Sequence, residues 1–458
     1  METHQEKNAT TDASTISIQQ VATQPTPFQI GARLLEVGVH LFVHTLRFAG
    51  KLLWKRLSRN NISRKALLGQ AAADLCNSLG ATFIKIGQIL STRRDLLSPE
   101  VIAPLIKLQD DIAPIPFRFV PPIVLTQFGR PLTAIFQEFE ERPISSASIA
   151  SVYRARLLDG RVVAVKVRRP EIVTRVACDL FIMRVMARLM GRLKVFTLIP
   201  MLEMINEVGQ YIERQVDLRI EASNNRRFRA QFAHEPLIQF PVLIEEYCTD
   251  AIIVMDFIED LVRIDQLQWA ETEYQQSLII GLRALYQMIF VDGFVHCDLH
   301  PGNMYFCPGG RVIMLDTGFV AELNRQNRFQ FTDFFLGIAT NDGKKCARIL
   351  YETAFSRTEP FDHDRFEQAT VEIIAKSSGS QARTFQVAPF VAQIFDVQRR
   401  FGLRGSTNFT MAILSLLVFE GIAKQLYPHL DFQKEAKPFL YEVIFEKQAE
   451  IMARNREV

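Results

Sequence analysis

The hydrophobic and polar positions change character twice within the first 60 residues. Residues 1–27 are rich in Thr, Gln and Ser and show no periodicity, which is typical of a disordered tail. In residues 28–57, apolar positions recur at helical spacing among basic residues, which predicts a basic amphipathic helix. Such a helix either lies on an anionic membrane surface or packs on the body of its own protein. The sequence leaves both alternatives open.

Further helices are expected up to about residue 134. Residues 65–92 continue the helical pattern. Ser98 is followed by Pro99 and Glu100, which marks a helix start, because Ser caps helices and Pro is favoured at the first helical position. We therefore expect a helical N-terminal extension over residues 28–134.

The pattern changes to strands near residue 135. Two β-rich runs, residues 151–157 and 161–168, are joined across Leu158-Asp159-Gly160, and Asp-Gly is a strong hairpin signal. Two long helices and two short strands are expected next: residues 173–192, 201–232, 242–246 and 252–257.

From about residue 274 the chain is mostly helical, with an interruption near residues 295–320. A small β-rich lobe with inserted helices (residues 135–260) and a larger helical lobe (residues 261–458) together predict an α+β, bilobal, protein-kinase-like fold. Because one fold can host many functions, the order of elements says little about activity. The residues that carry chemistry have to supply that argument.

Composition narrows the class of protein. The formal net charge of +3 over 458 residues argues against a partner that is a nucleic acid. Six scattered cysteines with no CxxC pair indicate reduced intracellular thiols. The most apolar stretch, residues 408–419, is too short to cross a bilayer and predicts a buried helix. We expect a cytoplasmic protein, either soluble or peripheral on the inner face of the membrane, without a transmembrane span.

The strongest local signal is the loop His296-Cys297-Asp298-Leu299-His300-Pro301-Gly302-Asn303. Phosphoryl transfer needs a carboxylate beside the attacking oxygen and an oxygen ligand for Mg²⁺. Asp298 followed five residues later by Asn303 matches the H-x-D-x-x-x-x-N spacing of kinase catalytic loops. His296 would orient the loop backbone. For this segment alone, a polar loop with a chance His and Asp is the alternative.

Two further segments weaken that alternative. Residues 311–315 predict a strand that leads into Asp316-Thr317-Gly318, the place where kinases carry a second metal-binding Asp. Thr317 stands where kinases usually have Phe, while Asp316 and Gly318 are kept. Upstream, residues 162–167 alternate like a strand and place Lys166 where a phosphate-binding lysine belongs, with Glu221 on a following helix as its carboxylate partner.

No G-x-G-x-x-G precedes Lys166; residues 144–152 (ISSASIASV) take its place. Cβ atoms restrict such a loop, but its backbone amides, as at Ala147, and the hydroxyls of Ser146 and Ser148 could still meet phosphate oxygens. In the kinase-like reading, Met255 and Phe257 would lie at the hinge that meets the adenine.

The chain resembles the UbiB/AarF family of atypical kinase-like proteins, which is linked to ubiquinone biosynthesis and lipid metabolism. The resemblance covers residues 28 to the C-terminus. It rests on the K-x-G-Q segment FIKIGQILS at 83–91 with Arg93, Asp95 and Leu96, the Ser/Ala loop at 145–148, Asp217, Glu221-Ala222, and YPHLD at 427–431.

The resemblance implies that the K-x-G-Q helix lies across the active-site mouth. Lys85 and Gln88 would share one helix face there. Lys85 would meet the acidic pair of an E-x-D helix, but Gln215 stands where the family usually has the first Glu, so Asp217 remains as its charge partner. A solvated surface lysine is the alternative for Lys85.

Together these features predict an ATP-dependent enzyme, a kinase or ATPase that uses ATP and Mg²⁺. Lys166, Glu221 and Asp298 would be the catalytic residues, and Asn303 and Asp316 would hold the metal. The resemblance implies a lipid or quinone-pathway partner at a membrane surface. A nucleotide-binding scaffold with little turnover is the alternative, and a true protein kinase ranks last because the Gly-rich loop is missing.

Overall fold

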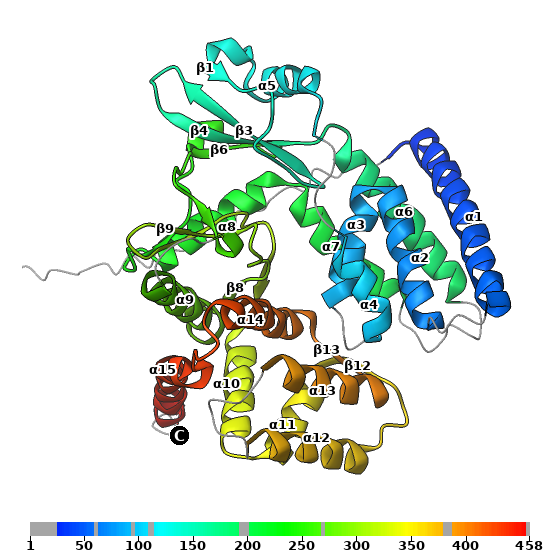
Figure 1. Cartoon of the computed structure of the whole chain (residues 1–458), viewed down its shortest axis with the longest axis vertical. Helices are drawn as coiled ribbons and strands as arrows, with labels where there is room; N and C mark the ends of the chain where they lie inside the picture. Colours follow the sequence, from blue (N-terminus) through cyan, green and yellow to red (C-terminus); the bar gives the residue numbers. More distant parts are fainter. Residues whose placement is uncertain are drawn as a thin grey trace, which may run out of the picture.

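The computed structural model describes residues 25–58, 63–92, 97–108, 114–191, 201–266, 271–378 and 387–454 (Figure 1). The expected disordered tail at residues 1–27 lies almost wholly outside the described residues. So do three residues of the family resemblance, Arg93, Asp95 and Leu96.

Four helices form the N-terminal extension: α1 (Pro27–Ser58), α2 (Arg64–Leu79), α3 (Ala81–Thr92) and α4 (Pro99–Ile106). The single helix expected over residues 65–92 is two helices, because Gly80 adopts a φ of 89° that ends α2. α4 begins at the predicted Pro99, after Ser98. Figure 1 shows α1 at the outer edge of the molecule, with α2 and α6 on its inner side.

The small lobe is built on an antiparallel sheet with the order β1-β3-β4-β6. β2 pairs with the start of β3, at Ser151 and Val152, beyond the part of β3 that pairs with β1. Its strands are β1 (Phe136–Phe139), β2 (Ser145–Ser146), β3 (Ala150–Leu157), β4 (Val162–Arg168) and β6 (Ile252–Asp256). The predicted hairpin is confirmed, since β3 and β4 pair in register around a turn with Gly160 at a φ of 89°. A short helix, α5 (Val120–Phe128), packs on this sheet.

Three helices are inserted between β4 and β6: α6 (Ile172–Met190), α7 (Met201–Gln215) and α8 (Leu218–Gln231). The expected helix over residues 201–232 is broken, because Asp217 has extended backbone angles and caps the start of α8. The strand expected at residues 242–246 is wrong. Leu243 makes one isolated bridge to Met255, and the chain then turns through a 3₁₀ helix at Glu245–Tyr247.

The large lobe begins with α9 (Glu271–Tyr286) and a π-helical turn (Gln287–Asp292). The expected interruption near residues 295–320 contributes β8 to β11, which form two small sheets together with two earlier strands, β5 and β7. One has the order β5-β10-β9-β7 and the other pairs β11 with β8. Their strands are β5 (Ile238–Gln239), β7 (Val262–Arg263), β8 (Phe294–His296), β9 (Met304–Cys307), β10 (Arg311–Met314) and β11 (Val320–Glu322). These strands position the loops that carry the candidate chemistry.

The remaining helices enclose one large apolar core at the bottom of Figure 1. They are α10 (Arg325–Ala339), α11 (Gly343–Glu352), α12 (His363–Ser378), α13 (Val387–Arg400), α14 (Thr407–Leu426) and α15 (Phe432–Arg454). A strand pair that the sequence did not reveal, β12 (Ala354–Arg357) with β13 (Leu403–Gly405), joins them.

Within the described residues, α14 is the one helix long and apolar enough to cross a membrane, judged by length and composition alone. The expected length of 408–419 is therefore wrong. The helix continues to Leu426. Its Glu420 accepts hydrogen bonds from the backbone N–H groups of Val387 and Ala388 at the start of α13 and pairs with Lys424 at 2.8 Å. More than half of its most apolar stretch is buried inside the protein, as in a core helix.

Candidate active site

Three charged side chains from distant parts of the chain meet in the cleft between the lobes. Lys166 on β4 donates hydrogen bonds to both carboxylate oxygens of Glu221 on α8, at 2.7 and 2.8 Å. The Lys166 ammonium also lies 3.2 Å from Oδ2 of Asp316, which follows β10. The sequence predicted this convergence, and the structure brings all three residues together.

The electrostatics of this cluster follow from its burial. Burial raises the pKa of Glu221 to about 7, because the loss of hydration and the charge of Asp316 outweigh the attraction to Lys166. Burial lowers the pKa of Lys166, but the two carboxylates raise it by more, so the net direction is upward. The pKa of Asp316 falls to about 2, because Lys166 and Lys85 lower it by more than its partial burial raises it. Lys166 is therefore cationic and Asp316 anionic at neutral pH.

The loop after β8 holds Asp298 and Asn303 against each other. The Asn303 side-chain amide donates to the Asp298 carbonyl at 2.9 Å and to its carboxylate oxygen Oδ2 at 3.2 Å. That orientation directs the Asn303 side-chain oxygen away from Asp298 and leaves it available as a ligand. His300, which the sequence analysis did not single out, places Nε2 3.8 Å from Oδ1 of Asp298.

His296 braces the loop, as predicted. Its ring is fully buried, its Nδ1 accepts from the backbone N–H of Asp298 at 3.2 Å, and its Nε2 lies 3.1 Å from the carbonyl of Leu315. Burial lowers the pKa of His296, so the imidazole is neutral, with the proton on Nε2. The ring thereby joins the loop of Asp298 to the strand that precedes Asp316.

Thr317 has a role that the sequence did not reveal. Its hydroxyl donates to the backbone carbonyl of Glu221 at 3.0 Å, and its own carbonyl accepts from the side-chain amide of Asn224 at 2.9 Å. Where kinases usually pack a Phe, this chain therefore ties the Asp316 loop to α8 by hydrogen bonds. Asp316 itself has a φ of 48°, and its Oδ1 accepts from the Gly318 N–H at 3.3 Å.

The loop that replaces the Gly-rich segment is held by Arg169. Its guanidinium donates to the carbonyl of Ala147 at 2.9 Å and to the hydroxyl of Ser146 at 3.0 Å. Ser146 also lies 2.8 Å from the hydroxyl of Ser151, so it serves the loop's own structure. The hydroxyl of Ser148 is fully buried and has no hydrogen-bond partner among the described residues. Both Ala147 and Ser148 line the same small pocket as Lys166.

The K-x-G-Q helix α3 sends Lys85 into this pocket. Lys85 lines it together with Lys166 and Asp298. Its charge helps to lower the pKa of Asp316 and opposes the rise in the pKa of Glu221 that burial causes. The structure thus favours an inward Lys85 over a solvated surface lysine.

The other two residues of the motif serve the packing of α3. Gln88 donates to the carbonyl of Leu108 at 3.0 Å and does not line the pocket. A Cβ at Gly87 would lie 2.3 Å from Cδ1 of Leu108, so any larger residue here would force the Leu108 side chain to move.

The predicted acidic partner of Lys85 is engaged elsewhere. Asp217 caps α8 by accepting from the Arg219 N–H at 3.0 Å and forms an ion pair with the Arg219 guanidinium at 2.7 Å. Gln215 lines the pocket beside Lys85, and its side-chain oxygen is buried without a hydrogen-bond partner among the described residues.

Met255 and Phe257 lie at the end of β6. Met255 pairs with Ala164 across the sheet, and the backbone N–H of Phe257 donates a hydrogen bond to the carbonyl of Val162 at 3.2 Å. Neither residue lines the pocket around Lys166, so contact with the adenine stays a prediction for both.

The side chains around Lys166 are of the types that bind a magnesium nucleotide, but the pocket that they line is small. Mg²⁺ prefers one or two carboxylates plus phosphate oxygens and water, and Asp316 with Asn303 offers one carboxylate and one amide oxygen. The pocket has a volume of only about 40 Å³, while ligand sites usually enclose roughly 300 Å³ or more. The pocket in this structure is therefore too small to enclose a whole nucleotide.

Comparison with known proteins agrees with this geometry. A model of the ABC1 atypical kinase-like domain matches residues 107–350, and a model of the UbiB helical domain matches residues 371–431. Proteins named "Probable protein kinase UbiB" are similar over most of the chain. The one from Tolumonas auensis is 29% identical over 86% of this chain and 73% of its own length. The one from Aeromonas hydrophila is 30% identical over 85% of this chain and 72% of its own length. The one from Pseudomonas paraeruginosa is 30% identical over 86% of this chain and 75% of its own length.

A solved structure from Mycobacterium tuberculosis, titled as a complex with erythromycin, covers 85% of this chain and 98% of its own at 21% identity. Its TM-score of 0.45 is too low to support an argument about this chain. The ABC1 match alone spans more than half of the sequence and confirms the expected α+β, kinase-like fold. The chain belongs to the UbiB family of ABC1 atypical kinase-like proteins.

Proposed function

We propose that this protein binds MgATP and transfers or hydrolyses its γ-phosphate, in support of ubiquinone or isoprenoid-lipid metabolism at a membrane surface. The observation that carries the proposal is the position of the Lys166 ammonium, which lies 2.7 Å from Glu221 and 3.2 Å from Asp316. Asp298 lines the same pocket, and the side-chain amide of Asn303 contacts the Asp298 carboxylate at 3.2 Å. Kinase-type chemistry needs these groups in this arrangement.

Each side chain has a distinct task. Lys166, oriented by Glu221, would contact the α- and β-phosphates. Asp316 and the side-chain oxygen of Asn303 would hold Mg²⁺, which neutralises charge on the phosphates. Asp298 would orient the attacking oxygen or accept its proton. The unpartnered hydroxyl of Ser148 is placed to donate a hydrogen bond to a phosphate oxygen.

Contact with an anionic membrane is supported by one face of α1. We define the outer face of α1 by its exposed apolar side chains at heptad-like spacing: Phe28, Leu35, Val39, Phe42, Leu46 and Leu53. Each is more than half exposed. The helix contains five basic residues and one acidic residue, Glu36, which is neutralised by Arg33 and Arg175. An apolar face on a basic helix is what binds an anionic bilayer, and it would place the protein peripherally on the inner face.

A second candidate function is a nucleotide-binding scaffold with little turnover, acting on lipid-biosynthetic partners. The narrow cleft and the direct contact of Lys166 with Asp316 favour it, because these groups satisfy each other without a nucleotide. A true protein kinase is disfavoured, because Lys85 from α3 lies in the pocket where a peptide would approach.

Steady-state phosphate release separates the two functions. The full chain is incubated with MgATP, with and without vesicles of phosphatidylglycerol and phosphatidylcholine, and nucleotide binding is measured in parallel. An enzyme releases phosphate in at least one condition, and Asp298→Asn removes this release. Binding of MgATP without release in either condition would support the scaffold. Absence of MgATP binding would overturn both.

A further inference from the structure

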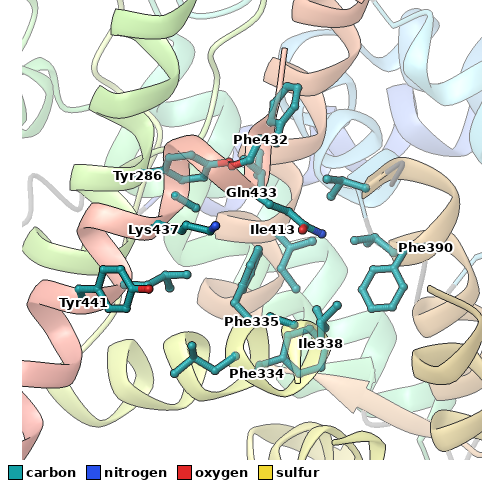
Figure 2. A pocket seen from close by; sticks show the side chains of 17 residues that line it. Tyr286, Phe334, Phe335, Ile338, Phe390, Ile413, Phe432, Gln433, Lys437 and Tyr441 are labelled. Atoms are coloured by element: carbon teal, nitrogen blue, oxygen red, sulfur yellow. The ribbon is translucent and has the colours of Figure 1, made fainter. Parts of the chain in front are cut away.

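The large lobe contains a second cavity that shares no residue with the pocket around Lys166. It lies among α9, α10, α13, α14 and α15 (Figure 2). Phe334 from α10, Phe390 from α13 and Ile413 from α14 form much of its wall, and all three side chains are buried. The cavity thus sits within the apolar core of the lobe, between helices that do not carry the residues of the cleft.

The cavity is large enough for a small apolar group. Its volume is about 190 Å³. A cavity of about 150 Å³ lined by Leu, Ile and Phe binds benzene, so this one accepts a ring with a short substituent or several methylenes of a chain. Well-packed interiors rarely leave such a space, whereas ligand sites are typically apolar hollows with a few polar groups.

The polar groups of this cavity gather on α15. Figure 2 shows the ammonium of Lys437 and the amide of Gln433 pointing from α15 into the space between α15 and α13. In the part of the chain that the structure describes, neither side chain has a hydrogen-bond or ion-pair partner. The hydroxyl of Tyr286 is already used, since it donates to the carbonyl of Phe432 at 2.9 Å. Lys437 is exposed, so this end of the cavity opens to solvent.

The charge at this opening is positive. Three carboxylates lie near Tyr286 in the cavity wall. Glu435 pairs with Arg283 at 2.7 Å, Glu420 pairs with Lys424 at 2.8 Å, and Asp431 accepts a hydrogen bond from the backbone N–H of Lys434 at 3.0 Å. Glu420 also accepts from two backbone N–H groups at the start of α13. Among the described residues none of these carboxylates forms an ion pair with Lys437, which is therefore a cation beside an apolar cavity. A ligand that satisfies both features has an apolar body and an anionic head.

We propose that this cavity binds an amphipathic anion, with its apolar chain or ring among Phe334, Phe390 and Ile413 and its carboxylate or phosphate head on Lys437 and Gln433. Charge-assisted hydrogen bonds from the ammonium and the amide hold the head, and burial of the chain supplies the rest of the affinity. Acyl carboxylates and prenyl phosphates share this chemistry. The site stands apart from the cleft and does not depend on the ATP chemistry.

Equilibrium dialysis of the full chain with labelled octanoate and, separately, labelled geranyl phosphate tests the proposal, with octanol as an uncharged competitor. We expect saturable binding at one site per chain for at least one anion. Lys437→Gln should weaken anion binding by about three- to tenfold, as expected for loss of a partly exposed charge contact, and leave octanol within about twofold. Lys434→Gln, on the same helix but outside the cavity, is the matched control and should change nothing.

A blocking variant fixes the location. Ala339 ends α10 in an exposed position and lines the cavity, so Ala339→Trp fills its edge without entering the core. It should abolish binding of anion and octanol alike, with an unchanged melting temperature. Preference for octanoate would support an acyl ligand, and preference for geranyl phosphate a prenyl ligand. Lack of saturable binding of either anion, or binding that persists in Ala339→Trp, would overturn the inference. MgATP binding in the same samples reports on the cleft independently.

Discussion

Arg33 on α1 and Asp179 on α6 form a buried ion pair, with Nε of the guanidinium 2.6 Å from Oδ1 of the carboxylate. The Arg33 side chain is 5% exposed and that of Asp179 is fully buried. Arg33 also donates to the carbonyl of Leu79 at the end of α2. α1 is therefore packed on the body of the protein through its inner face, one of the two alternatives that the sequence left open. Membrane contact concerns the opposite face of the same helix.

Removal of Arg33 should destabilise the protein. Arg33→Leu leaves Asp179 buried without a partner, and breaking a buried pair in this way costs about 3–5 kcal/mol. Urea unfolding followed by circular dichroism measures the loss. Arg33→Leu/Asp179→Leu should recover a large part of the stability, because no buried charge remains. Arg47→Leu, at an exposed position of α1, is the matched control, with an expected change within about 0.5 kcal/mol. Equal effects of the two single substitutions would contradict a structural role for the pair.

The outer face of α1 should decide membrane binding. Phe42→Glu/Leu46→Glu places two negative charges in the middle of this face, so the fraction that floats with phosphatidylglycerol vesicles should fall several-fold. Leu68→Glu makes the same kind of change at an exposed leucine of α2 and should leave flotation intact. Flotation that survives the double substitution would remove the membrane assignment. Conversion of a dimer to a monomer would indicate that the face binds a second copy of the chain.

Asp316→Asn should weaken nucleotide binding that depends on the metal and leave metal-free nucleotide binding nearly unchanged. The substitution keeps the shape of the side chain but removes the charge that would face Mg²⁺ and that lies 3.2 Å from Lys166. Affinity for MgATP should fall at least about 100-fold, while the weak binding of ATP in EDTA changes little. Isothermal titration in both conditions checks this. Asp298→Asn should keep MgATP binding, because Asp298 serves the attacking group. Equal loss in the two variants would argue against the division of roles.

The parts of the site that could be predicted from sequence are those fixed by short spacings. Asp298 and Asn303 are five residues apart on one loop, and Asp316 follows directly from a strand, so local structure brings them to one place. Lys166 could be assigned because alternation and a hairpin signal define β4 on their own. These features need no knowledge of tertiary contacts, which is why they agree with the structure.

The remainder depends on contacts between distant elements. Arg169 holds the Ser/Ala loop, but nothing in its neighbourhood distinguishes it from a solvated arginine. Asp217 was expected to face Lys85, whereas it caps α8 and pairs with Arg219, because a local backbone N–H and a guanidinium two residues away satisfy it first. The helix predicted over residues 201–232 ends before Asp217, which caps α8. Asp is a common helix cap, but the continuous helical periodicity on both sides led to the prediction of one helix.

We expect the hydroxyl of Thr317 to hold the loop that carries Asp316 against α8. Thr317→Val preserves shape but removes the hydrogen bond to the carbonyl of Glu221, so we expect a loss of about 1 kcal/mol in the free energy of unfolding. MgATP affinity should fall as well, since Asp316 is the preceding residue. Thr317→Ser keeps the hydroxyl and should stay close to the wild type in both measurements. If the Val and Ser variants behave alike, the hydroxyl does not position this loop.

Acid should weaken the attachment of α15, which forms one wall of the second cavity. Asp333 on α10 pairs with Lys345 on α11 at 2.9 Å and with Lys447 on α15. Its partial burial raises its pKa, but the two lysines lower it by more, so the net direction is downward. The folded protein therefore binds this proton less readily than the unfolded chain. The stabilisation is complete well above the ordinary carboxyl pKa of about 3.8 and is lost as the pH falls through and below it.

The pH dependence of this stabilisation by Asp333 can be measured by urea unfolding between about pH 6 and pH 3. Asp333→Asn should be less stable than the wild type at the upper end, and the difference should shrink as the pH falls, because the wild-type carboxyl becomes neutral too. Asp364, exposed in the first turn of α12, supplies the control Asp364→Asn. A constant difference between wild type and Asp333→Asn over this range would mean that the carboxylate does not bind α15 electrostatically.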